Sequence, residues 1–176
     1  GTGLIVNHAY MENGNYTITL TVTDNDGAIA STNATKTVLD RLPVASFVSS
    51  PSAPYTSDTV TFNASSSYDP DGTVVSYFWA FGDGTNATGV VTNHAYAENG
   101  NYTATLIVVD NDGSSASTSA AKTVLNRPPV ASFMASATTV NKNQVVTFNA
   151  SASYDPDGTV TSYYWSFGDG TNATGT

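Results

Sequence analysis

Apolar and polar residues alternate in short runs along the chain, and clusters of Gly, Pro, Asn and Asp separate these runs. Such alternation is typical of strands that bury one face. No stretch of the chain places apolar side chains at helical spacing, so the pattern predicts an all-β fold. The strands predicted in the middle of the chain cover residues 44–48, 59–65, 74–81, 90–94, 102–109 and 117–125.

The alternation also predicts which side chains face the core. About seven short strands joined by turns are typical of a two-sheet β-sandwich, in which every second residue of a strand points inward. The inward side chains expected from this phase are Val60, Phe62, Ala64, Tyr77, Trp79, Phe81, Ala104, Leu106 and Val108. Trp79 and Phe81 are predicted structural core residues. Trp165 and Phe167 have the same phase in a later strand and are predicted to be core residues too.

Three motifs recur in the chain at one constant spacing. They are Tyr-Asp-Pro-Asp-Gly, Asn-His-Ala-Tyr and Phe-Gly-Asp-Gly-Thr, at residues 68–72 and 154–158, 7–10 and 93–96, and 81–85 and 167–171. Each pair is offset by 86 residues, as from Tyr68 to Tyr154. A fixed period of this kind indicates tandem copies of one structural module.

The string Tyr-Phe-Trp-Ala-Phe-Gly-Asp-Gly at residues 77–84 resembles the Trp-x-Phe-Gly-Asp-Gly signature of polycystic kidney disease (PKD) domains. Further motifs of that family stand at residues 69–72, 94–96, 100–103 and 110–113. The resemblance covers essentially the whole chain and implies immunoglobulin-like, two-sheet β-sandwich modules in tandem. Similar modules occur in prokaryotic surface-layer proteins and secreted hydrolases. We therefore expect an extracellular protein on a prokaryotic, specifically archaeal, cell surface.

The resemblance divides the chain into three parts. Residues 1–39 resemble the C-terminal half of one PKD domain and form the C-terminal half-module. Residues 43–125 resemble a complete domain, the complete module. Residues 129–176 resemble the N-terminal half of another domain, the N-terminal half-module. The linkers between them are short and contain proline, which restricts the backbone, so we expect semi-rigid spacing.

The N-terminal half-module lacks the strands that would cover its large apolar side chains, which are Phe133, Phe148, Trp165 and Phe167. Burying one such side chain contributes roughly 1.5–3 kcal/mol, so an uncovered face of this kind seeks a partner. The missing strands are of the type that the C-terminal half-module carries. Either the chain is part of a continuous array, or one subunit completes its neighbour by strand addition. Both alternatives predict identical modules head to tail as partners, and an extended thread.

Charge and composition exclude several classes of protein. Lys and Arg number 5 against 14 Asp and Glu, for a net charge of −9, which argues against nucleic-acid binding. No apolar run is long enough to span a bilayer, so we expect no membrane insertion in this segment. The chain has no cysteine, which excludes disulfides and thiolate metal sites.

Four aspartates in two turn motifs are candidate metal ligands: Asp69, Asp71, Asp110 and Asp112. In an immunoglobulin-like sandwich the two loops that carry them lie at the same end, beside the linker from the preceding module. Clustered carboxylates favour Ca²⁺, the one cofactor that we consider possible. Turn chemistry alone also explains Asp-Pro-Asp-Gly and Asp-Asn-Asp-Gly. A third alternative is that Arg41 or Arg127 neutralises the cluster without a metal.

Seven Asn-x-Ser/Thr sequons could accept N-linked glycans. They lie at Asn15, Asn33, Asn63, Asn86, Asn101, Asn149 and Asn172. Asn86 and Asn172 are the preferred acceptors, because we place them in an exposed loop after the Gly-Asp-Gly turn. Glycans on some of these residues are expected to keep the surface soluble and resistant to proteases.

The sequence offers no catalytic constellation, and we predict that the chain is not an enzyme. His8 and His94 are the only histidines, and neither has an evident nucleophile nearby. The leading hypothesis is a structural repeat of an extracellular filament, surface layer or stalk. An alternative is an accessory polysaccharide- or protein-binding module of a secreted hydrolase, which requires aligned exposed aromatics such as Tyr68, Phe78 and Tyr164. The other alternative is a calcium-stiffened adhesin.

Overall fold

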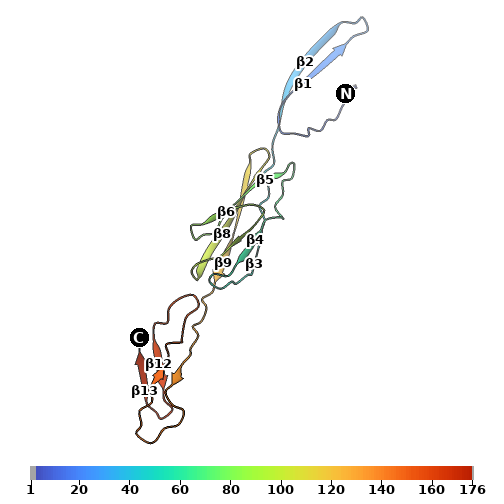
Figure 1. Ribbon diagram of the computed structural model, residues 1–176. Coiled ribbons are helices and arrows are strands. Elements are labelled where there is room, and N and C mark those ends of the chain that lie inside the picture. The colour runs from blue at the N-terminus through green and yellow to red at the C-terminus, as the bar shows by residue number, and fades with distance from the viewer. Residues whose placement is uncertain (1–2, 176) are drawn as a thin grey trace.

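The computed structural model describes residues 3–175, and within that range the regular structure is all β. The two half-modules and the complete module follow one another along a thread, with the complete module in the middle (Figure 1). In the described residues, no helix is long and apolar enough to cross a membrane. The strands are β1 (Gly14–Thr23), β2 (Ile29–Val38), β3 (Val48–Ser50), β4 (Val60–Asn63), β5 (Val74–Ala80), β6 (Asn86–Thr88), β7 (Val91–His94), β8 (Gly100–Asp110), β9 (Ser115–Val124), β10 (Met134–Ala135), β11 (Phe148–Asn149), β12 (Tyr163–Ser166) and β13 (Asn172–Gly175).

The complete module is a sandwich of two antiparallel sheets. One sheet has the strand order β3-β4-β7 and the other β6-β5-β8-β9. A parallel bridge between Tyr55 and Leu125 ties the segment that follows β3 to the end of β9. The predicted immunoglobulin-like, two-sheet β-sandwich is confirmed.

The core lies between the inner faces of these two sheets. Val60 and Phe62 on β4 are fully buried against Trp79 on β5 and Leu106 on β8. The indole Nε1 of Trp79 donates a hydrogen bond of 2.9 Å to the Gly89 carbonyl, so its polar edge is satisfied inside the sandwich. The predicted inward phase of the strands is therefore confirmed, although Tyr77 is only half-buried.

Two details of the predicted strands are wrong. The strand predicted over residues 44–48 is reduced to a bridge between Val44 and Tyr68 and a strand that begins at Val48, because side-chain bonds replace the ladder between them. The backbone N–H of Ser46 donates to Ser67 Oγ at 3.0 Å, and the Ser67 hydroxyl donates back to the Ser46 carbonyl at 2.8 Å. The second detail is β6, a short edge strand on β5 at a place predicted to be a loop.

The C-terminal half-module is a hairpin with an uncovered apolar face. Strands β1 and β2 pair from Gly14↔Val38 to Thr23↔Ile29, which is the register of β8 and β9 shifted by 86 residues. Leu20 is 58% exposed, whereas Leu106 at the same place in the complete module is 0% exposed. The hairpin forms because its backbone groups pair locally, but within residues 3–175 no second sheet covers it.

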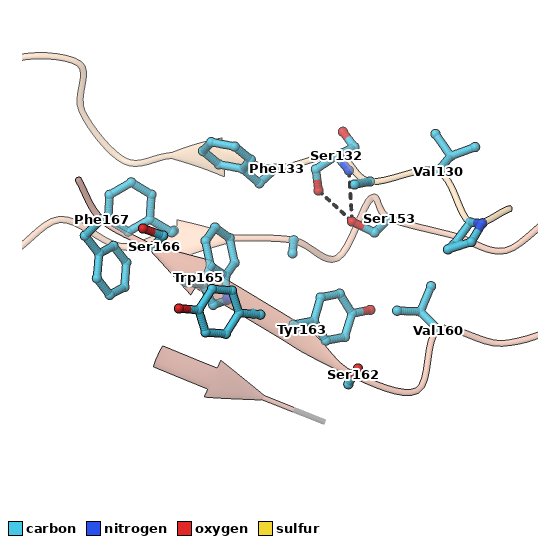
Figure 2. A pocket seen from close by; sticks show the side chains of 15 residues that line it. Val130, Ser132, Phe133, Ser153, Val160, Ser162, Tyr163, Trp165, Ser166 and Phe167 are labelled. Carbon is cyan, nitrogen blue, oxygen red and sulfur yellow. Dashed lines mark hydrogen bonds between the residues drawn. The ribbon is translucent and has the colours of Figure 1, made fainter. Parts of the chain in front are cut away.

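The N-terminal half-module lacks the pair of strands that the C-terminal half-module contains. Trp165 is half-buried and Phe167 is 42% exposed, so their predicted core positions are not core positions in this part of the chain. In the complete module, Trp79 and Phe81 are buried by strands β8 and β9, which have no counterpart beside residues 129–175. Figure 2 shows Phe133, Trp165 and Phe167 lining the open side.

We expect Leu106→Ala to lower the free energy of unfolding of the complete module by about 2–5 kcal/mol, because it leaves a cavity beside Trp79, its cross-strand neighbour. The control is Ile107→Ala, since Ile107 is the next residue on β8 but 37% exposed, and should cost less than about 1 kcal/mol. Chemical denaturation followed by tryptophan fluorescence measures both. Equal losses for the two variants would contradict the assigned inner face.

Candidate functional site at the module junctions

The linkers hold the following module by a backbone hydrogen bond that occurs at both junctions. The Arg41 backbone N–H donates to Asp71 Oδ2 at 3.2 Å, and the Arg127 backbone N–H donates to Asp157 Oδ2 at 2.8 Å. The two contacts are offset by 86 residues, like the motifs themselves. The second aspartate of each Asp-Pro-Asp-Gly turn thus receives the preceding linker.

The side chain of Arg127 points back to the complete module. Its guanidinium forms an ion pair with Asp58, and its Nε donates to the Thr56 carbonyl at 3.4 Å. The guanidinium carbon also lies 5.4 Å from the centroid of the Tyr55 ring, within the range of a cation–π contact. Arg127 therefore binds the module before it through its side chain. Through its backbone N–H it binds the turn at Asp157 in the module after it.

This arrangement differs from the predicted neutralisation of the aspartate cluster by an arginine. The guanidinium of Arg127 pairs with Asp58 of the complete module, and it is the backbone N–H of Arg127 that reaches Asp157. That backbone hydrogen bond is the main cause that lowers the pKa of Asp157 below its usual value, against an opposing effect of desolvation. Sequence reasoning could not find this geometry, because Asp58 lies 69 residues before Arg127.

The four predicted metal ligands mainly accept hydrogen bonds within their turns. Asp110 is buried, and its Oδ1 accepts the backbone N–H groups of Asp112 at 3.0 Å and Ser114 at 2.8 Å. Asp71 receives the linker, and Asp112 Oδ2 accepts a bond of 3.1 Å from the Asn111 side chain. Across residues 3–175, no group of three or more His, Cys, Asp or Glu side chains is arranged to hold a metal ion. Hydrogen bonds within the turns, together with the linker bond to Asp71, account for these contacts.

Several carboxylate oxygens at the first junction are nevertheless buried without a hydrogen-bond partner. They are Oδ2 of Asp69, Oδ2 of Asp110 and both side-chain oxygens of Asp40. Desolvation, followed by the negative charges of Asp71 and Asp110, raises the pKa of Asp69 although a hydrogen bond from Asp71 opposes this. Sequence analysis missed Asp40, and its position immediately before Arg41 in the linker was the only available signal.

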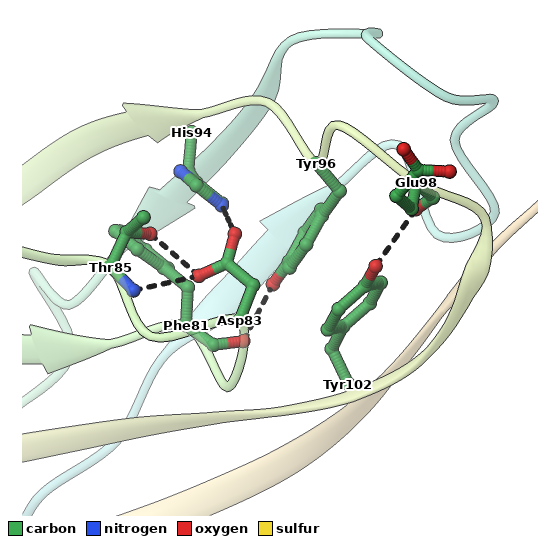
Figure 3. Close-up of polar contacts among 7 residues, drawn as sticks. All are labelled: Phe81, Asp83, Thr85, His94, Tyr96, Glu98 and Tyr102. Carbon is green, nitrogen blue, oxygen red and sulfur yellow. Dashed lines mark hydrogen bonds and ion pairs between the residues drawn. The ribbon is translucent and has the colours of Figure 1, made fainter. Parts of the chain in front are cut away.

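His94 fastens the Gly-Asp-Gly turn to β7 (Figure 3). Its Nε2 lies 2.7 Å from Asp83 Oδ2, and its ring stacks on Phe81 with 4.1 Å between the centroids. The Tyr96 hydroxyl donates to the Phe81 carbonyl at 3.2 Å, and burial raises the pKa of Tyr96 to about 12. Gly82 adopts φ +88°, and an added Cβ there would lie 2.7 Å from the Thr103 carbonyl oxygen, so the turn requires glycine. His94 thus has a structural role.

Asp83 carries the negative charge of this turn. Burial opposes its ionisation, but the hydrogen bonds donated by Thr85 and the contact with His94 outweigh that effect, so the pKa of Asp83 lies below its usual value. A carboxyl whose pKa is depressed in the folded state stabilises the fold above its unfolded pKa, and that stabilisation is lost as the pH falls through the folded pKa.

The aromatic side chains proposed for polysaccharide binding are exposed but not aligned. Tyr68 bridges to Val44, whereas Phe78 lies on β5 with Ile107 and Thr88 as its cross-strand neighbours. Tyr164 holds the place of Phe78 in the N-terminal half-module. In the complete module these neighbours form no row of aromatic rings along one sheet face, which is the feature that such a binding surface requires.

The sequon asparagines fall into two groups. Asn15 and Asn101 accept cross-strand hydrogen bonds from Thr hydroxyls at 2.7 and 2.8 Å, and Asn63 and Asn149 each accept a backbone N–H of their own turn at 2.9 Å. The remaining three are exposed, as Asn15, Asn101 and Asn149 also are, and lie on strands: Asn33, Asn86 and Asn172. Asn86 and Asn172 begin short strands, so their predicted placement in a loop is wrong, while their predicted exposure is correct. Glycan occupancy stays a prediction.

Comparison with known proteins matches the whole chain to one family model. The model is described as "PKD domain", and it matches residues 1–39, 40–125 and 126–176. Collagenase ColA of Clostridium perfringens is 31% identical over 129 residues, which cover 73% of this chain and 11% of that protein. A microbial collagenase of Vibrio alginolyticus is 39% identical over 59 residues, covering 34% of this chain and 7% of that protein.

A solved structure of a single PKD domain matches about half of this chain. The crystal structure of the PKD1 domain of Vibrio anguillarum Epp is 30% identical, with a TM-score of 0.44, and covers 49% of this chain and 96% of that one. Both collagenases come from bacteria, and they give no support to the archaeal source expected from the sequence.

We expect Asp83→Asn to lower the free energy of unfolding by about 1–2 kcal/mol at pH 7, because it weakens charge-assisted hydrogen bonds. The difference from the native chain should shrink as the pH falls below about 4, where the carboxyl of the unfolded chain becomes protonated, and should be lost once the pH passes the depressed pKa of the folded carboxyl. Urea denaturation at several pH values measures this. The control Glu98→Gln also removes one carboxylate but, among the described residues, no side-chain hydrogen bond. A deficit for Asp83→Asn that does not change with pH would refute the assignment.

Proposed function

The chain belongs to the PKD domain family, and from that premise we propose that it is a non-catalytic, semi-rigid spacer within an extracellular protein. The observation that carries the proposal is the contact made by Arg127. One residue bonds the module before it and the module after it, so the two are held in a defined orientation. The linker prolines restrict the backbone beside this contact. A chain built this way keeps adjacent modules at a fixed distance and in a fixed orientation.

The relatives support an accessory segment of a secreted hydrolase better than a free-standing filament or a surface layer. The chain spans about a tenth or less of the two collagenases it matches, 11% and 7% of their lengths. Collagen lies outside cells, which supports an extracellular location. In such a protein, the spacer sets the distance between other domains, or between a domain and its anchor.

A spacer is favoured over a binding module by the placement of the aromatic side chains. Recognition of polysaccharide or of a protein fibre needs several rings on one face, whereas Phe78 has Ile107 and Thr88 beside it, and Tyr68 pairs with Val44. Isolated exposed aromatics are ordinary features of a sheet surface.

We expect the distance distribution between the complete module and the N-terminal half-module to be narrow, and to broaden in Arg127→Ala. Double electron–electron resonance on a pair of introduced, spin-labelled cysteines measures it, since the chain has no native cysteine to interfere. The control is Arg41→Ala, because within residues 3–175 the Arg41 guanidinium makes no hydrogen bond or ion pair. A broad distribution in the native chain would overturn the spacer proposal.

A second candidate function is a calcium-stiffened junction. The three side chains are not arranged as a formed metal site within residues 3–175, but the buried oxygens without partners on Asp40, Asp69 and Asp110 favour calcium. Buried negative charge is costly unless a cation or a donor compensates it. Ca²⁺ binds carboxylate oxygens of this kind. Bound there, a cation would neutralise these carboxylates, whose pKa is raised at Asp69, and hold the linker beside the two turns.

We expect millimolar Ca²⁺ to raise the melting temperature of the complete module relative to the chelated chain, and Asp40→Asn to reduce this rise. Asp40 is the suitable position because it makes no hydrogen bond that the substitution would break among the described residues. Asp26→Asn, in the C-terminal half-module, is the control and should leave the rise unchanged. Identical melting temperatures with chelator and with Ca²⁺ would eliminate the calcium site.

A further inference from the structure

The N-terminal half-module contains an apolar groove that strands could fill. Its volume is about 430 Å³, and its lining includes Phe133, Phe148, Trp165 and Phe167 (Figure 2). Phe133 precedes β10 and is 61% exposed, and Phe167 follows β12 and is 42% exposed, which is unusual for large aromatic side chains of a sandwich.

The groove already has the shape of a sandwich interior. The Phe133 and Trp165 ring centroids are 5.4 Å apart, and those of Phe148 and Trp165 are 5.8 Å apart. Their counterparts 86 residues earlier, inside the complete module, are separated by 5.1 and 5.6 Å. Binding therefore requires little rearrangement of the groove, which keeps the entropic cost of association low.

The hairpin β1–β2 has the structure of the strands that the groove lacks. In the complete module these strands are β8 and β9, and the two hairpins have the same register. Ile18, Leu20 and Val22 are 45%, 58% and 54% exposed, and they stand where the fully buried side chains of β8 stand. The apolar face of the hairpin and the apolar groove thus correspond to the two halves of the core of the complete module.

Polar groups of the two half-modules match as well. His8 and Tyr10 pack edge to face at 4.7 Å, as His94 and Tyr96 do at 4.5 Å. In the complete module, His94 pairs with the aspartate of the Gly-Asp-Gly turn. The corresponding Asp169 holds the same bonds to Thr171, and among the described residues it has no histidine beside it.

The hairpin and the groove of one chain lie at opposite ends of the thread, with the complete module between them (Figure 1). We propose that the β1–β2 hairpin of one copy of this chain fills the groove of a second copy and completes its sandwich. His8 of the first copy then pairs with Asp169 of the second. The contact joins two different surfaces, so each added copy leaves one hairpin and one groove free and the assembly extends head to tail. The proposal does not depend on the spacer function.

The test uses two variants of the whole 176-residue chain, each with one surface blocked. Leu20→Asp places a charge on the inner face of the hairpin and leaves the groove intact, and Phe167→Asp does the reverse. Sedimentation equilibrium should show that the native chain forms oligomers whose mean mass rises with concentration in steps of 18.2 kDa. Each variant alone should be monomeric, and an equimolar mixture should form a dimer and nothing larger.

The control is Thr19→Asp, on the opposite face of β1, which should assemble like the native chain. Circular dichroism checks that the complete module remains folded in all variants. A native chain that is monomeric at every concentration would overturn the proposal, and so would single variants that still assemble or a mixture that stays monomeric. Loss of the narrow distance distribution in the spacer experiment would leave these results unchanged, so the two proposals fail separately.

Discussion

The apolar face of a β-sheet has to be covered, and the rest of this structure depends on how that cover is supplied. In the complete module, β4 and β5 present Phe62 and Trp79 to Leu106 on β8, and all three side chains are removed from water. Backbone pairing alone can form a hairpin or a short sheet, as both half-modules demonstrate. Burial needs both sheets in full, and among residues 3–175 only the complete module has the sheets β3-β4-β7 and β6-β5-β8-β9.

The contacts at the junctions set the orientation of each sandwich relative to its neighbour. Each linker donates a backbone hydrogen bond to the turn of the next module, and at the second junction Arg127 also binds Asp58 and stacks near Tyr55 of the module before. The repeat does not reproduce this side-chain contact everywhere. The positions 86 residues after Tyr55 and Asp58 are Asn141 and Gln144, which keep the local turn but offer no negative charge.

Much of the fold could be predicted because strand alternation and a fixed repeat are local properties of the sequence. Trp79 and Phe81 follow from the phase of one strand, and the motif spacing identifies the module. Predictions were wrong where a local pattern competes with side-chain chemistry, as at Ser46, whose backbone bonds Ser67 in place of a strand partner. The candidate site was harder to predict, since Asp40 and Asp58 have no motif of their own and matter only through distant neighbours.

The sequence by itself determined the strand phase, the period of 86 residues and the family, because each of these is written in the order of apolar, polar and turn residues. Only the tertiary structure decided which of those apolar residues are buried. Leu20 and Leu106 have equivalent places in the repeat, yet one is 58% exposed and the other 0% exposed. The physical reason is that a side chain is buried only where a second surface packs against its own. The pattern of a strand in the sequence describes only one of these two surfaces.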